Sequence, residues 1–137
     1  MLFLLLPLAL GAGVAVGYRR WRSRPSPYLP RKVEVYNATT VQHLARKVSL
    51  LLRRRGLDVL YFGNFPRASG NAKRPGKTLI VDYRDPKGRY ARALRDWLGC
   101  GKVIQHYDPY AVVEVGIVLG EDYARCFPGV DTVRILF

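Results

Sequence analysis

The chain has 137 residues, a hydrophobic share of 49% and a formal net charge of +13. This length provides for one domain of ordinary size and excludes two, and the apolar share is sufficient for a packed core. The excess of positive charge favours polyanionic partners, which include nucleic acid, acidic lipid head groups and anionic wall polymers. Composition does not choose among these three classes.

The first 17 residues carry no charged side chain. As a helix they measure about 26 Å, slightly less than the roughly 30 Å of a bilayer's hydrocarbon core, and Tyr18 and Trp21 follow them as interfacial residues. We therefore expect residues 1–17 to form a single transmembrane anchor. The alternative is a cleaved signal peptide, because Ala15 and Gly17 are small residues suitably placed for cleavage before Tyr18. The lack of basic residues ahead of the apolar run favours the retained anchor.

Residues 18–32 form a basic, proline-rich stretch with six basic residues and no acidic one. Its prolines, Pro25, Pro27 and Pro30, favour extended chain, so we expect a semi-rigid linker before a domain at 33–137. That domain has 17 basic and 10 acidic residues and hence a net charge of +7. A basic cluster directly after an apolar segment favours a cytoplasmic position of that side, which conflicts with an external domain.

The first half of the domain predicts a strand, a helix and two further strands. Residues 33–36 alternate as a short strand. Apolar residues between Val41 and Leu52 then recur on one helical face, with Thr39 or Thr40 as the cap and Gly56 as the end. Residues 57–62 form the second strand, 63–77 a polar loop, and 78–83 the third strand.

The second half predicts a helix and two strands. Asp85 and Pro86 are typical of a helix start, and the helix runs to Leu98. Residues 102–106 and 111–119 form strands, and 132–137 is a weak further candidate. The order β-α-β-β-α-β-β predicts an α/β two-layer sandwich, in which both helices cover one face of a mixed sheet.

Several segments of the domain resemble the LytR C-terminal domain family, which is often appended to LytR–CpsA–Psr cell-wall ligases and also occurs alone behind a membrane anchor. The matching segments are 33–39, Leu44-Ala45 with Leu51, 55–59, Gly63-Asn64 and 115–123. Asn37-Ala38-Thr39 stands where the family usually has Asn-Gly-Thr/Ser. The resemblance implies an extracytoplasmic domain near peptidoglycan without catalysis of its own.

Two groups of residues are candidates for ligand binding. Aromatic rings stack on sugar faces and amides bond sugar hydroxyls, which indicates a glycan site near the carboxyl ends of strands one and two, at Tyr36, Asn37, Asn64 and Phe65. The following loop carries cations suited to an anionic polymer, namely Arg67, Lys73, Arg74 and Lys77. The alternatives are a core position for the neighbouring Tyr61 or Phe62 and an ordinary solvated loop.

Catalytic and metal-binding patterns are not evident. His43 and His106 are the two histidines, and a metal site needs three or four convergent ligands. The carboxylates at 82, 85, 121 and 122 have simple readings as caps and turns. Cys100 and Cys126 lack CxxC spacing; outside the cytoplasm they would be able to form a disulfide, and inside they would remain thiols. We expect no enzyme, no cofactor and no metal.

These observations predict a non-catalytic module in the bacterial cytoplasmic membrane, crossing it once, with the domain outside. It would bind or scaffold at peptidoglycan or an attached anionic wall polymer, with other envelope proteins as further partners. The alternative is a cytoplasm-facing basic module that binds nucleic acid or acidic lipid. Because no recognisable RNA-binding motif interleaves aromatic and basic residues, nucleic acid is not the expected partner.

Overall fold

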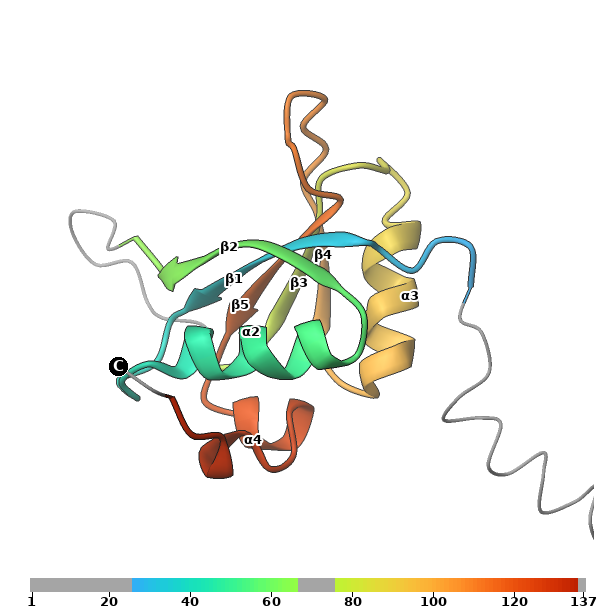
Figure 1. Ribbon diagram of the computed structural model, residues 1–137. Coiled ribbons are helices and arrows are strands. Elements are labelled where there is room, and N and C mark those ends of the chain that lie inside the picture. Colours follow the sequence, from blue (N-terminus) through green and yellow to red (C-terminus); the bar gives the residue numbers. More distant parts are fainter. Residues whose placement is uncertain (1–25, 67–75, 136–137) are drawn as a thin grey trace, which may run out of the picture.

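The computed structural model describes residues 26–66 and 76–135 (Figure 1). The predicted anchor at 1–17, most of the linker and the loop residues 67–75 lie outside this part of the chain. Within the two described ranges, no helix has the length and apolar character needed to cross a membrane.

Five strands form one mixed sheet in the order β2-β1-β5-β3-β4. They are β1 Lys32–Asn37, β2 Asp58–Asn64, β3 Leu79–Asp82, β4 Lys102–Gln105 and β5 Val115–Leu119. Strand β1 is parallel to both β2 and β5, while β3 is parallel to β4 and antiparallel to β5. The predicted mixed sheet is confirmed. Strand β5 is shorter than expected, since residues 112–114 are bends and residue 111 is not strand.

Helices α2 (Leu44–Arg54) and α3 (Arg89–Leu98) connect β1 to β2 and β3 to β4. The two β-α-β units run in opposite directions and extend to opposite sides of β5. Crossovers of the same hand therefore place both helices on one face of the sheet, as Figure 1 shows. The two-layer arrangement predicted from the element order is confirmed.

The core lies between the helices and this face. Side chains of the sheet and of both helices form one buried cluster, which includes Val35, Leu44, Ile80, Leu94 and Ile117. Each of these five side chains is fully buried. Because side chains alternate along a strand, the strand residues directly before and after these buried ones point to the other face of the sheet. Neither α2 nor α3 covers that face, and we call it the helix-free face.

Both main helices begin later than expected. Helix α2 starts at Leu44 because residues 38–43 form bends and turns that follow β1. Helix α3 starts at Arg89 because Asp85 and Pro86 belong to a turn that the Gly88 N–H closes on the Asp85 carbonyl at 2.9 Å. The Asp85 carboxylate still accepts the N–H of Arg89, the first helical residue, at 3.0 Å, so it caps the helix from four residues earlier in the sequence.

The segment after β5 corrects the prediction of a strand at 132–137. It contains a short helix, α4 (Tyr123–Cys126), and a 3-10 turn, η1 (Val130–Thr132). Residues 133–135 are not strand, and 136–137 lie outside the described part. Phe127 and Val130 are buried in the core cluster. Their spacing of three residues suits a helical turn better than a strand, which would direct them to opposite faces.

The last residues of the predicted linker belong to the folded domain. The Tyr28 ring meets the edge of Tyr90 at 5.4 Å between centroids, and the Arg89 guanidinium lies 4.8 Å from the Tyr28 ring centroid. Leu29 packs against the core and Pro30 is buried. A fragment meant to contain the whole domain therefore starts near residue 26.

Candidate ligand-binding edge of the sheet

The sheet has two opposite ends at which its strands start or finish. At one of these ends, the carboxyl ends of β1, β2 and β5 meet the amino ends of β3 and β4; we call this end of the sheet the pocket edge. Asn37 and Asn64 are partners in the register there, and Lys77 lies two residues before β3. The described members of the predicted site therefore share this edge. Arg67, Lys73 and Arg74 lie outside the described residues.

An open pocket of about 890 Å³ lies at this edge. Its charged lining residues are Lys77, Arg95, Asp96, Lys102, Asp122 and Arg125. They come from the residues before β3, the last turns of α3, the start of β4 and the region of α4. The four cations exceed the two carboxylates, so the pocket has a local excess of positive charge.

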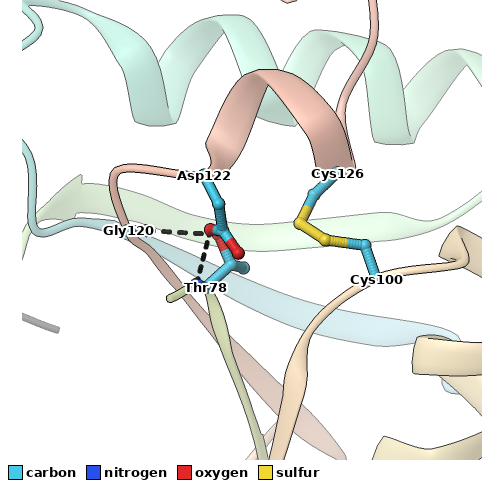
Figure 2. Close-up of a disulfide and its surroundings, with 5 residues drawn as sticks. All are labelled: Thr78, Cys100, Gly120, Asp122 and Cys126. Atoms are coloured by element: carbon cyan, nitrogen blue, oxygen red, sulfur yellow. Dashed lines mark hydrogen bonds between the residues drawn. A yellow bond between two sulfur atoms is a disulfide. The ribbon is translucent and has the colours of Figure 1, made fainter. Parts of the chain in front are cut away.

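The two carboxylates are already engaged. Arg95 forms an ion pair with Asp96 at 3.2 Å. Asp122 accepts the Thr78 N–H at 2.7 Å and the Thr78 hydroxyl at 2.8 Å (Figure 2).

The remaining pocket cations have no such partner. Among residues 26–66 and 76–135, ion pairs occur at Arg89–Asp85 and Arg95–Asp96 and do not involve Lys77, Lys102 or Arg125. These three cations line the same pocket, and Lys77 is the one that the sequence singled out as a candidate.

A disulfide lies at the pocket, which Cys100 lines. Cys100 and Cys126 are bonded, with their Cα atoms 5.1 Å apart, and join the α3–β4 connection to α4 (Figure 2). The sequence left this pairing open. A second tie runs from Thr78, whose hydroxyl accepts the Gly120 N–H at 3.2 Å. Together these links hold α4, and with it Arg125, beside β3 and β4.

The disulfide also decides whether the pocket is a metal site. One potential ligand atom each from Cys100, Asp122 and Cys126 falls within 4.8 Å of the others. Metal-binding cysteine is a thiolate, whereas both sulfurs here are bonded to each other. Asp122 is bonded to Thr78 as described above. The cluster therefore does not fit a metal ion in this oxidised state.

Tyr36 lies next to the pocket edge on the helix-free face. Its ring contacts Tyr61 at 5.6 Å between centroids. A Cβ on Gly63, the β2 partner of Tyr36 in the register, would fall 2.7 Å from the Tyr61 oxygen. The Tyr61 ring therefore packs directly over Gly63, and the two rings form a continuous aromatic surface.

Glu34 and Tyr83 extend this aromatic surface. The Tyr36 hydroxyl donates to the Glu34 carboxylate at 2.9 Å, and the Tyr83 ring lies over Gly116, the β5 partner of Glu34. Burial, followed by this hydrogen bond and the Glu34 charge, raises the pKa of Tyr36 well above its usual value. Glu34 and Tyr83 were not among the predicted site residues, although the alternation of β1 places residues 34 and 36 on one face.

The remaining predicted residues have different surroundings. Asn37 is 7% exposed; its amide donates to the Val41 carbonyl at 2.6 Å and accepts the Thr39 N–H at 2.9 Å. It shapes the turn after β1 with both ends of its amide. Asn64 and Phe65 are exposed, and the Phe65 N–H donates to the Asn37 carbonyl at 2.8 Å, so all three lie together.

The other candidate carboxylates and histidines have structural settings. Asp82 is fully buried and accepts the Ala91 N–H at the start of α3 at 3.0 Å. The hydrogen bond from Arg89 lowers the pKa of the Asp85 carboxyl well below its usual range. This effect is larger than the opposing effect of burial, which raises the pKa. His43 lies in a left-handed conformation ahead of α2, and the His106 ring meets the edge of Tyr83.

Comparison with known proteins identifies the family. Residues 31–123 match LytR_C, which is described as "LytR cell envelope-related transcriptional attenuator". The chain belongs to this family. LytR_C thus makes the domain a cell-envelope-related module and confirms the resemblance found in the sequence.

A solved structure shares the fold of this LytR_C domain. The soluble domain of a conserved hypothetical secreted protein from Mycobacterium marinum superposes with a TM-score of 0.54 at 23% sequence identity. The match covers 77% of this chain and 68% of that domain. A comparison with curated proteins finds no match.

Proposed function

We propose that the chain is a non-catalytic, membrane-tethered cell-envelope module whose pocket edge binds peptidoglycan or an anionic polymer attached to it. The observation that carries this proposal is a group of three pocket cations beside the disulfide, Lys77, Lys102 and Arg125. None of them forms an ion pair within the described part of the chain. Ammonium and guanidinium groups bind phosphate and carboxylate oxygens through charge-assisted hydrogen bonds. An anionic wall polymer presents such oxygens at every repeat.

The tyrosines of the helix-free face supply a second kind of contact. Tyr36 and Tyr61 form an aromatic surface next to the pocket edge, and Glu34 provides an acceptor for sugar hydroxyls. The Tyr36 phenol is neutral at physiological pH, because the ordinary pKa of tyrosine is already about 10 and burial raises the pKa of Tyr36 further. The ring surface therefore suits neutral sugar rings, while the pocket cations suit the charged groups of the same polymer.

The settings of the acidic residues support a binding role over catalysis. A catalytic pair of carboxylates requires two groups that reach one substrate atom and differ in pKa. Asp82 and Asp85 instead bind backbone N–H groups at the start of α3, and Asp122 binds Thr78. Each of these three carboxylates thus has a structural partner.

The disulfide and the apolar N-terminal run support the external, tethered position. Disulfides persist in oxidising compartments and are rare in the cytoplasm, which favours the outer side over the arrangement indicated by the basic linker. Residues 1–17 have the composition of a membrane anchor. Residues 18–25 then join this anchor to a domain that begins near residue 26.

The proposal is tested by co-sedimentation of residues 26–137 with purified wall sacculi, with and without their attached anionic polymers, over a salt series. Replacement of Lys77, Lys102 and Arg125 by Gln should weaken binding at low salt by at least about tenfold. Three surface cations at roughly 0.5–1 kcal/mol each reach the 1.4 kcal/mol that a factor of ten requires. The remaining binding should depend less on salt.

The matched control carries the same charge change at Lys47, Arg54 and Arg84, which do not line the pocket. It should bind nearly as well as the unaltered domain. An equal loss of binding in both variants would show that the effect comes from net charge alone and not from the pocket. Binding to DNA as strong as to sacculi at matched salt would favour the nucleic-acid alternative, and release of soluble sugar or peptide fragments would identify an enzyme.

A further inference from the structure

The edge opposite the pocket carries a projecting loop. Here the amino ends of β1, β2 and β5 meet the carboxyl ends of β3 and β4; we call this the linker edge. The connection from β4 to β5 extends beyond the sheet at this edge, as the orange loop at the top of Figure 1 shows. We call residues 107–112 the tyrosine loop.

The tyrosine loop presents apolar side chains to solvent. Tyr107, Tyr110 and Val112 are 54%, 91% and 68% exposed. The other large exposed apolar residues of the described ranges belong to β2 or directly follow it. Single exposed apolar residues are ordinary, but a group of them on one projection marks a contact surface.

Hydrogen bonds hold this loop in its projecting form. The Asp108 carboxylate accepts the Tyr110 N–H at 3.0 Å, and the Asp108 carbonyl accepts the Ala111 N–H at 3.1 Å. At the base of the loop, the Asp108 N–H donates to the Tyr83 carbonyl at 2.9 Å, and Val113 is 1% exposed. The exposed side chains are thus held outward by an ordered turn.

The N-terminal part of the chain joins the domain beside the base of this loop. The Glu114 N–H donates to the Lys32 carbonyl at 3.1 Å, and the Lys32 N–H donates to the Glu114 carboxylate at 2.9 Å. Arg31, Lys32 and Arg84 are exposed at the same edge. The described part of the chain therefore begins on the side of the molecule from which the tyrosine loop projects.

We propose that the tyrosine loop docks into the head-group zone of the bilayer that holds the N-terminal anchor, a membrane surface with acidic phospholipid. This inference rests on the anchor of the proposed function. Tyrosine is enriched at this depth because its ring is apolar and its hydroxyl is polar, and Arg31, Lys32 and Arg84 complement acidic head groups. The docked domain holds its pocket edge away from the membrane by the length of a strand, roughly 17–20 Å.

The test uses the full chain, one copy per lipid nanodisc, with phosphatidylglycerol in the bilayer. A fraction of the lipid carries a nitroxide on its head group, and backbone amide signals are compared with and without reduction of the nitroxide. We expect loss of the signals of residues 107–112 and retention of those near Phe65, at the pocket edge. Retained signals in the tyrosine loop together with loss near residue 26 would overturn the docking and leave both the anchor and the wall-binding proposal standing.

Two variants separate docking from simple proximity. Tyr110→Ser combined with Val112→Ser should restore the loop signals while the chain stays in the disc, because the contact depends on these exposed side chains. Phe65→Ser removes a comparable amount of exposed apolar surface at the pocket edge. In this variant, the nitroxide should still abolish the signals of the tyrosine loop. Unaltered loss in the double variant would overturn the proposal. Failure of the full chain to enter discs would overturn the anchor and this inference with it, whereas wall binding by residues 26–137 is measured separately.

Discussion

The pocket edge and the linker edge are stabilised by different chemistry. At the pocket edge, a disulfide between Cys100 and Cys126 and the Asp122–Thr78 hydrogen bonds tie the strand ends to α4. At the linker edge, Asp82 and Asp85 bind the turn and the first N–H groups of α3. The pocket edge should therefore respond to reductant, whereas the linker edge should respond to acid through Asp85, whose pKa is lowered. The proposed binding surface at the pocket edge and the apolar loop at the linker edge are thus separable by experiment.

The largest effect should come from Asp82 at the linker edge. Its carboxylate is fully buried and accepts the N–H groups of Arg84, Asp85 and Ala91. Asp82→Ala leaves these donors without their acceptor and should lower the free energy of unfolding by roughly 3–5 kcal/mol. Urea denaturation measures the loss. A change below about 1 kcal/mol would show that water replaces the carboxylate and that the linker edge does not depend on it.

Loss of the disulfide should have the next largest effect. The pairing closes a segment with a sequence separation of 26, for which loop entropy predicts roughly 3.5 kcal/mol of stabilisation. Cys100→Ser combined with Cys126→Ser should lower stability by about this amount and speed amide hydrogen exchange in α4. Exchange in the tyrosine loop should stay unchanged in a folded sample. Equal acceleration at both edges would show that the two are not independently held.

The smallest effect concerns acid and Asp85. The pKa of this carboxyl is lowered in the folded chain, first of all by its hydrogen bond with Arg89. The stability it contributes is therefore present above the unfolded value of about 4 and is lost as the pH falls below it. Asp85→Asn should be less stable than the unaltered domain at pH 7, and the difference should shrink toward pH 3. A constant difference across this range, measured by denaturation at each pH, would contradict the role of the charge.

Much of the fold follows from local patterns in the sequence. The alternation in β1 and the apolar stripe of α2 gave the correct element types, and Gly56 and Gly99 marked the helix ends. Helix starts were placed too early because Thr39 and Asp85 accept backbone N–H groups of turns as readily as those of helices. The short helix α4 lacks a repeat long enough for a periodic pattern.

The site was predictable only in part, because its assembly depends on strand order. Lys77 was identified from a basic loop, but its neighbours Lys102 and Arg125 come from segments that are distant in sequence. They meet because β5 lies between β1 and β3, and hydrophobic periodicity carries no information on that order. The pairing of Cys100 with Cys126 was left open for the same reason, since it requires a distance between two segments.

The position of β5 has a consequence for the order in which the domain folds. The units β1-α2-β2 and β3-α3-β4 are each contiguous in sequence, but the sheet joins them only through β5. Its pairing with β1 connects Val33 to Val115, so one of the most distant contacts in sequence completes the sheet. During synthesis or export, both units emerge before the strand that unites them. Until residue 119 is available, β1 and β3 each have one side without a pairing strand, at the place that becomes the centre of the finished sheet.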